Sequence, residues 1–230
     1  MKRKLWALLC AAALLHGAAL ADGGGQVVQS SCSTMQAGNV WVAYCYAQVY
    51  NPTDDVICLE AGSFDLLSGG DRLASGVVEQ ITPYFLNPGE SGYLYDAVVF
   101  EPEDGETMPQ VTGISYDMHY MTVESGYAAP KLSAQAESFR QENGDYTFEI
   151  TVRNDTDRPA WGPTVAFGLY SSGGALLYAD GRTLESVGIL PGNSVVVRFD
   201  VARGFTDHWQ EYGVSPDEVR AVASFGGGDD

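Results

Sequence analysis

Short runs of alternating apolar and polar residues, separated by Gly, Pro, Asn and Asp, fill the chain from Val27 onward. The alternation is clearest from Tyr146 to Arg153, where Tyr, Phe, Ile and Val alternate with Thr, Glu and Arg. A period of two residues places every second side chain on one face of a strand, so this segment predicts a strand with one buried face. Residues 43–49 and 195–201 show the same alternation. The pattern predicts an all-β protein.

Further strands are predicted where Val, Ile, Tyr, Phe and Leu gather between turn residues. These segments are 56–67, 92–99, 111–121, 160–170 and 219–225. Helical periodicity is scarce. Single helical turns are predicted at residues 206–212 and 216–219, the second because Ser215 is a suitable cap and Pro216 a suitable first helical residue.

The sequence contains an internal repeat with a constant offset of 103 residues, since 154 − 51, 167 − 64 and 191 − 88 are all equal to it. Three pairs of motifs carry the repeat: Asn51-x-Thr53-Asp54 and Asn154-x-Thr156-Asp157, Phe64-x-Leu66-x-Ser68-x-Gly70 and Phe167-x-Leu169-x-Ser171-x-Gly173, and Pro88-Gly89-x-Ser91 and Pro191-Gly192-x-Ser194. An offset of this length is that of one whole domain, too long for a solenoid unit. Two copies of one small domain are therefore expected.

The N-terminus has the features of a secretory signal. A basic start at residues 2–4 is followed by an apolar run from Leu5 to Leu15, and Ala19-Leu20-Ala21 fits the small-x-small cleavage pattern. The apolar run is too short to predict a membrane span, and no later segment predicts one. The mature chain is therefore expected to be secreted or extracytoplasmic. The predicted division is a signal peptide at 1–21, a flexible Gly-rich leader at 22–26, domain 1 at 27–126, domain 2 at 127–225 and a disordered acidic tail at 226–230.

About seven strands in about a hundred residues are typical of an immunoglobulin-like β-sandwich, so two tandem domains of this class are predicted. The segment Phe167-Gly168-Leu169-Tyr170, which follows an Asn154 turn and precedes Pro191-Gly192, resembles bacterial FxLYD-type domains. Ser171 stands in place of the aspartate of that pattern, and the first copy departs further, with Leu67-Ser68 after Phe64-Asp65-Leu66. The resemblance implies an extracytoplasmic immunoglobulin-like module without an active site.

The chain is strongly acidic, and loss of the three cations at residues 2–4 takes the net charge from −18 to −21. Such a charge repels nucleic-acid phosphates and anionic lipid headgroups, so neither is an expected partner. It favours solubility, and diffuse attraction of cations is the alternative.

Cleavage removes Cys10 and leaves Cys32, Cys45 and Cys58, an odd number for an exported protein. A hairpin turning at residues 38–39 would place Cys32 opposite Cys45, whereas a bridge from Cys45 to Cys58 would cross the core. All three can also be reduced. The second copy carries Phe148 and Trp161 in place of Cys45 and Cys58, which predicts that both cysteines point inward.

Neither catalysis nor a cofactor is predicted, and the protein is not expected to be an enzyme. The serine of Gly89-Glu90-Ser91-Gly92 has a turn counterpart in Ser194, and His119 and His208 lie in different copies without ligand-spaced neighbours. An acidic loop at residues 101–106 offers oxygen ligands for weak calcium binding, but its spacing matches no EF-hand loop and it is expected to be a solvated loop.

A difference between the copies gives the main functional hypothesis. On the outward face of two strands, the second copy has the non-aromatic residues Thr147, Glu149, Arg153, Val196 and Arg198. The first copy has tyrosines at all of these positions: Tyr44, Tyr46, Tyr50, Tyr93 and Tyr95. In an immunoglobulin-like sandwich these two strands are neighbours, so the five tyrosines, here called the tyrosine face, would form one surface.

Tyrosine offers a large, rather rigid contact area with a polar tip, which suits recognition of protein and carbohydrate. The tyrosine face therefore predicts a non-catalytic binding module for a protein or glycan at the cell envelope. The alternative is that the face is covered by the second copy or the leader and stabilises the sheet. The protein would then be a structural spacer without a ligand of its own.

Overall fold

The structure is a computed structural model that describes residues 24–37, 40–79, 81–100, 111–123, 127–137, 140–142 and 145–226. The predicted signal peptide, the acidic loop at residues 101–106 and most of the predicted tail lie outside the described residues. The described residues up to 123 are called the N-terminal half, and those from 127 onward the C-terminal half.

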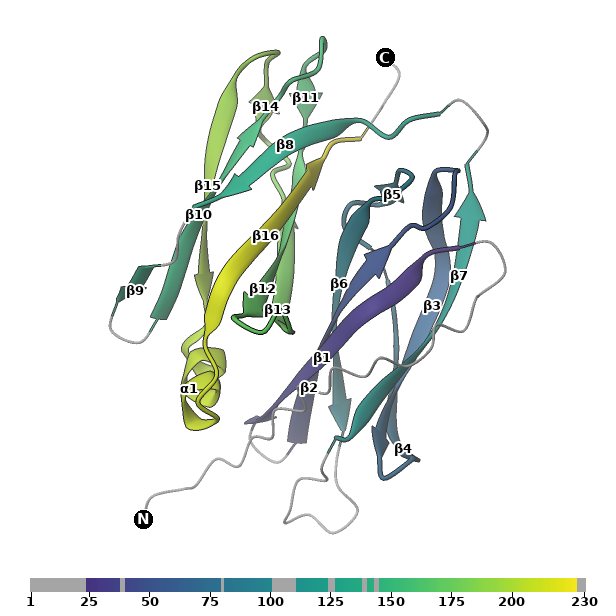
Figure 1. Ribbon diagram of the computed structural model, residues 1–230, viewed down its shortest axis with the longest axis vertical. Coiled ribbons are helices and arrows are strands. Elements are labelled where there is room, and N and C mark those ends of the chain that lie inside the picture. Colours follow the sequence, from purple (N-terminus) through teal and green to yellow (C-terminus); the bar gives the residue numbers. More distant parts are fainter. Residues whose placement is uncertain are drawn as a thin grey trace.

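The N-terminal half contains two antiparallel sheets (Figure 1). In one, β2 (Val40–Tyr50) lies between β1 (Gln26–Ala37) and β6 (Ser91–Phe100). In the other, β3 (Ile57–Ser68) pairs with β4 (Asp71–Val77), β5 (Phe85–Leu86) and β7 (Gly113–Thr122). Apolar residues from both sheets form one core, which includes Cys45 and Val49 of β2 and Ile57 and Leu66 of β3.

The C-terminal half curls into a half-barrel in which neighbouring strands follow the order β13-β12-β16-β8-β10-β15. These strands are β8 (Lys131–Ala136), β10 (Asp145–Arg153), β12 (Thr164–Ser171), β13 (Leu176–Thr183), β15 (Ser194–Val201) and β16 (Pro216–Ser224). The start of β8 pairs with β16 and its end with β10, so this one strand joins the two sides. Short strands β9 (Arg140–Glu142), β11 (Ala160–Trp161) and β14 (Gly188–Ile189) and the helix α1 (Arg203–Glu211) complete it.

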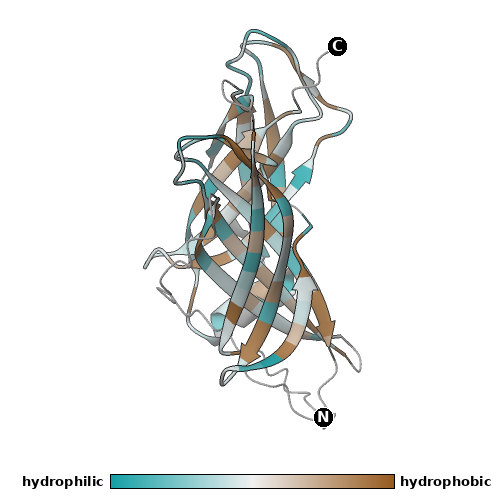
Figure 2. Cartoon of the chain, turned by 90° about the vertical axis from the view of Figure 1, so that its right-hand side faces the viewer, coloured by the Kyte–Doolittle hydropathy of each residue, from teal (hydrophilic) through white to brown (hydrophobic). Residues whose placement is uncertain are grey.

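The predicted all-β class is confirmed, and most predicted strands are present, with β15 covering the predicted residues 195–201. The alternation along them is visible as bands of hydrophobic and hydrophilic residues (Figure 2). The helical turn predicted at 206–212 is part of the longer α1. The turn predicted at 216–219 is wrong, because these residues belong to β16, where Pro216 pairs with Ser171. Proline is tolerated as the first residue of a strand, so its position could be read in either way.

The N-terminal glycines pack against the N-terminal half. Gly24 and Gly25 are buried against the ring of Tyr120, where an added Cβ would collide with it, and β1 begins at Gln26. These residues belong to the segment predicted as a flexible leader.

The internal repeat extends to individual hydrogen bonds. Asn51 is fully buried, and its Nδ2 donates to the backbone oxygens of Asp55 at 2.8 Å and Leu86 at 2.9 Å. Its Oδ1 accepts from the backbone N–H of Thr53 at 3.0 Å, the turn bond expected of this motif. Asn154 makes the same bonds 103 residues further along, with Arg158 at 2.8 Å, Ile189 at 2.8 Å and Thr156 at 3.0 Å.

The cysteines follow the strand pattern. Cys32 and Cys45 are direct partners on β1 and β2, as the hairpin prediction required, and Cys45 points inward. The prediction that Cys58 points inward is met only in part, because Cys58 is buried but does not belong to that core. Ile57 and Leu59 of β3 fill the core, so Cys58 between them lies on the other face.

The counterpart of Cys58 shows the same orientation. Trp161 is 66% exposed, so an aromatic residue at this position of the second copy does not indicate that Cys58 points into the core. Cys58 itself is 4% exposed and belongs to neither of the two core clusters of the described residues.

Candidate functional site

The strands β2 and β6 are neighbours in one sheet, as predicted for the tyrosine face. Tyr46 lies directly opposite Tyr95, and Tyr93 lies opposite Gln48. Tyr44 and Tyr50 lie on the same face of β2, two residues before and four residues after Tyr46. Sequence reasoning therefore placed the five tyrosines on one surface, and the strand pairing brings them together.

That surface is not open to solvent. Tyr46 is 3% exposed and Tyr93 2% exposed, while Tyr44, Tyr50 and Tyr95 are half-buried. Four of them belong to, or pack against, the core cluster of the C-terminal half, and among the described residues Tyr50 is the exception. The C-terminal half therefore covers the tyrosine face, which is the arrangement expected if these tyrosines stabilise the sheet and do not form an open binding surface.

Aromatic residues of the C-terminal half cover the tyrosine face. The ring of Tyr44 meets the edge of Phe205 in α1, with ring centres 5.1 Å apart. Tyr46 packs against Tyr178 of β13 at 5.0 Å, and Phe205 contacts both Tyr46 and Tyr178. Tyr95 packs against the same cluster. Edge and tilted arrangements of this kind contribute favourable contacts beyond burial of their area.

Tyr93 reaches the C-terminal half through polar contacts as well. The hydroxyl of Tyr170 in β12 is 3.1 Å from the Tyr93 hydroxyl and donates to Gln48 Oε1 at 3.0 Å. Burial raises the pKa of both tyrosines, so their hydroxyls stay protonated at neutral pH. The guanidinium of Arg220 lies 4.1 Å from the centre of the Tyr170 ring. Arg220 donates a hydrogen bond to the Glu218 carboxylate at 2.8 Å, and this bond raises the pKa of the guanidinium above its ordinary value. The guanidinium over the ring is therefore a cation.

Gly168 provides the space for Tyr93. A Cβ at this position would lie 2.5 Å from Cε1 of Tyr93, so the ring rests on the bare backbone of β12. The equivalent residue of the first copy is Asp65. This glycine, at the second position of Phe167-Gly168-Leu169-Tyr170, was the sequence signal that a ring packs here.

A second contact between the halves lies at the segment that joins them. Asn87, in the turn before β6, accepts from the backbone N–H of Ala129 at 2.8 Å and donates to its carbonyl oxygen at 3.2 Å. Lys131 at the start of β8 forms an ion pair with Glu90 of the same turn, and Asn87 Nδ2 donates to that carboxylate at 2.9 Å. The joining segment is therefore attached to the N-terminal half by its backbone.

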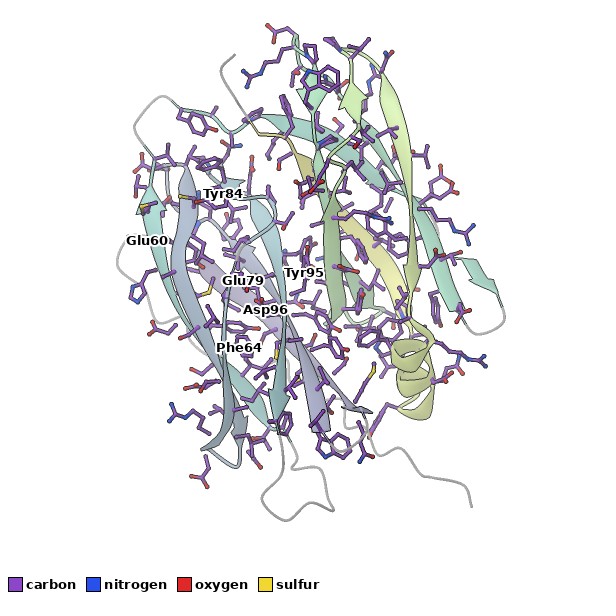
Figure 3. The ribbon with its side chains drawn as sticks, turned by 180° about the vertical axis from the view of Figure 1, so that it is seen from behind. Glu60, Phe64, Glu79, Tyr84, Tyr95 and Asp96 are labelled. Atoms are coloured by element: carbon purple, nitrogen blue, oxygen red, sulfur yellow. The ribbon has the colours of Figure 1, made fainter. Side chains whose placement is uncertain are left out.

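An acidic pair lies behind the tyrosine face. In Figure 3, Tyr95 lies toward the C-terminal half, whereas Asp96 and Glu79 lie within the N-terminal half. Asp96 is the β6 partner of Cys45, and burial followed by the charge of Glu79 raises its pKa to about 6. One carboxylate oxygen of Asp96 is buried without a hydrogen-bond partner among the described residues.

An exposed aromatic cluster lies at the opposite end of the N-terminal half from β4. Phe85 meets Tyr84 at 4.8 Å and Tyr127 at 5.3 Å, both edge-on. Tyr84 is 50% exposed and Tyr127 37% exposed. Sequence reasoning did not single out these rings, because Tyr127 lies more than forty residues along the chain from Tyr84 and Phe85 and only the fold brings them together.

Neither metal ligation nor a helical membrane span has support among the described residues. In this part of the chain, no three His, Cys, Asp or Glu side chains are placed to share a metal ion. None of the described helices has the length and apolar character needed to cross a bilayer.

No protein-family model matches the sequence, and no curated protein matches it. Among solved structures, the exo-chitosanase CsxA of Amycolatopsis orientalis is 15% identical over 76% of this chain and 24% of that chain, with a TM-score of 0.26. Red sea bream transglutaminase is 11% identical over 87% and 29% of the two chains, with a TM-score of 0.23. This chain thus spans under a third of each of these proteins, and at such TM-scores the likeness carries no argument about function.

Proposed function

We propose that the protein is a non-catalytic extracytoplasmic spacer, in which two tandem immunoglobulin-like modules of FxLYD type are held in one fixed arrangement. The burial of Tyr46 and Tyr93 against the C-terminal half carries this proposal. The tyrosine face differs from the equivalent face of the second copy because it has a partner within the same chain. A spacer needs such a contact, since modules joined only by a flexible linker do not hold a fixed distance.

Two separate attachments support the rigid arrangement. The tyrosine face packs on β12, β13 and α1, and Asn87 binds the joining segment at Ala129. Because the two contacts lie at different places, any motion of one half relative to the other must disrupt buried packing, backbone hydrogen bonds or both. The acidic character of the chain suits a spacer as well, because charge repulsion keeps it from associating with itself.

The test is a distance measurement between the halves. Spin labels are attached at the exposed residues Asp71 and Asn193 through an unnatural amino acid, so that the native cysteines stay in place. A single narrow distance distribution is expected, and a variant carrying Tyr46→Ala and Tyr93→Ala should broaden it. A broad distribution in the unaltered protein would contradict the spacer.

A binding module is the second candidate, and the cluster that the half-buried Phe85 forms with the exposed rings of Tyr84 and Tyr127 favours it. Such rings could contact a protein or glycan at the cell envelope. Glycan-array binding and capture of envelope material would be compared between the unaltered protein, a Tyr84→Ser and Tyr127→Ser variant, and Tyr50→Ser as a control. A ligand lost only in the first variant would establish this function. If no ligand binds any of the three proteins, this candidate is wrong.

A further inference from the structure

Two of the three cysteines of the described residues form a matched pair. Cys32 on β1 and Cys45 on β2 are direct partners in the antiparallel ladder. They are 2% and 0% exposed, and both belong to the core of the N-terminal half. Their thiols are close enough for a hydrogen bond between them. The sequence left three arrangements of the cysteines open, and this placement distinguishes them.

Strand geometry favours a bridge between these two residues. Directly opposite residues in an antiparallel pair have Cα atoms about 4.5 to 5.5 Å apart. That range lies within the separation of about 4.4 to 6.8 Å that a disulfide spans. A bond between Cys32 and Cys45 therefore requires rotation of side chains but no movement of the strands.

A bridge to Cys58 is disfavoured by the same geometry. Cys58 belongs to β3 in the opposite sheet, and packed sheets lie about 10 Å apart, beyond the reach of a disulfide. Its side chain also lies on the outer face of that sheet, where its thiol contacts the Tyr84 hydroxyl and lies near Glu60. Figure 3 shows Glu60 at the edge of the N-terminal half far from Tyr95, and Tyr84 at the upper end of that half.

We propose that Cys32 and Cys45 are joined by a disulfide in the exported protein, while Cys58 keeps its thiol. The proposal rests on the extracytoplasmic location that is part of the proposed function. Export places the chain in a compartment where disulfides form and persist. The bridge would join β1, the edge strand of its sheet, covalently to the strand that carries Tyr44 and Tyr46.

The oxidant is a disulfide, either that of a thiol oxidoreductase or oxidised glutathione. One cysteine thiolate attacks a sulfur of the oxidant and forms a mixed disulfide, which releases the first oxidant thiol. The second cysteine thiolate then attacks the protein sulfur and releases the second oxidant thiol. The protein loses two electrons and two protons, and the oxidant gains them.

The disulfide forms while the chain folds, before the core closes around the two thiols. The hydrogen bond from Cys32 and burial raise the pKa of Cys45, so the folded pair contains little of the reactive thiolate. A chain that has not yet closed its core leaves both thiols open to the oxidant.

The experiment has two arms, so that the pairing and the location are tested separately. In the first arm, the full chain with C10S is reduced, unfolded and refolded in a mixture of reduced and oxidised glutathione. In the second arm, the chain is exported by a bacterial host and purified from outside the cytoplasm. Both products are denatured, treated with N-ethylmaleimide and mapped by mass spectrometry.

Both arms should give one maleimide group, at Cys58, and a linked peptide pair that contains Cys32 and Cys45. C58S should give no maleimide group, and reduction before labelling should restore two. A bridge to Cys58, or three labelled cysteines in the refolding arm, would overturn the proposed pairing. If the bridge forms on refolding but not in the second arm, the pairing stands and the disulfide in the exported protein is contradicted. If no chain is recovered outside the cytoplasm, the location on which the proposed function depends is contradicted instead.

A stability measurement tells the bridge from two packed thiols. Reduction should lower the denaturation midpoint of the unaltered protein and of C58S, because a cross-link restricts the unfolded chain. It should leave the midpoints of C32S and C45S unchanged. Equal responses of all four proteins would also overturn the proposal.

Discussion

At the scale of single residues, the repeat is preserved most fully at two buried asparagines, which make the same three hydrogen bonds to the backbone in both copies. Asn51 and Asn154 end equivalent strands, and each joins its own turn to a backbone oxygen 35 residues further along. An amide can donate and accept at once, so one side chain satisfies three backbone groups that would otherwise be unpaired. Apolar positions tolerate exchange between the copies, as Cys45 and Phe148 show, whereas this role demands asparagine.

Replacement of Asn154 by alanine should lower the free energy of unfolding by on the order of 3 kcal/mol, because it leaves buried backbone groups without partners. Asn193→Ala is the matched control, since Asn193 is exposed and such changes stay within about 0.5 kcal/mol. Urea denaturation followed by tryptophan fluorescence measures both. An Asn154 variant as stable as the control would show that the turn does not depend on this side chain.

Asp96 is the residue that should give the stability a dependence on pH. Its pKa is about 6 in the folded protein, above the ordinary value of 3.8, because of burial first and the charge of Glu79 second. Between these values the folded state holds the proton that the unfolded state has lost. Stability should therefore fall as pH rises from about 4 to 6 and then level off.

Asp96→Asn removes this titration and should stabilise the protein at pH 8 by on the order of 1 kcal/mol, an amount reduced by partial solvent access of the carboxyl group. The advantage should shrink as pH falls through 6 toward 4. Unfolding curves at several pH values test this, with Asp71→Asn as an exposed control. A constant difference between Asp96→Asn and the unaltered protein across this range would contradict the assignment.

At the scale of elements, β12 serves both the interior of its own half and the contact between the halves. Phe167 and Leu169 point into the C-terminal core, while Gly168 and Tyr170 meet Tyr93 of the other half. The alternation of a strand makes this possible, since its two faces are independent. β3, the equivalent strand, carries Asp65 at the position of Gly168 and faces no such partner among the described residues.

Gly168→Ala should destabilise the protein by about 1 to 3 kcal/mol, because its Cβ would overlap the Tyr93 ring. Gly173→Ala is the control, since a Cβ there meets only Ser171 Oγ at 3.7 Å. In a double-mutant cycle, Tyr93→Ala should remove part of the cost of Gly168→Ala, measured by chemical denaturation. Strictly additive effects would show that the two residues do not share the contact.

At the scale of the whole molecule, the sequence predicted the repeat, the strands and the surface that carries the five tyrosines. It did not predict what covers that surface, because the two copies meet through unlike faces and no symmetry links Tyr46 to Tyr178. The helix α1 was a further obstacle. It follows β15, and beyond it the offset between the copies changes. Phe64 pairs with Tyr116, and the equivalent Phe167 pairs with Ala221. Ala221 lies 105 residues after Tyr116, whereas the motifs before α1 are offset by 103. Phe205 of α1 therefore has no counterpart among the repeated motifs.

The tyrosine face should make the two halves unfold together. Tyr46 and Tyr93 belong to the core cluster of the C-terminal half although they lie on strands of the N-terminal half, so neither core can open without disturbing the other. Calorimetry of the unaltered protein should show one transition whose van't Hoff and calorimetric enthalpies agree. The variant with Tyr46→Ala and Tyr93→Ala should show two, since each change removes about 3 to 5 kcal/mol of buried aromatic contact.

Trp161→Ala provides the control for this measurement, because Trp161 is a large aromatic residue that is 66% exposed and belongs to neither core cluster of the described residues. It should leave a single transition. Two transitions in the unaltered protein would mean that the halves unfold independently and that the contact of the tyrosine face with the C-terminal half does not couple them. One transition in the double variant would instead place the coupling in the joining segment, where Asn87 binds Ala129, and Asn87→Ala added to that variant should then separate the halves.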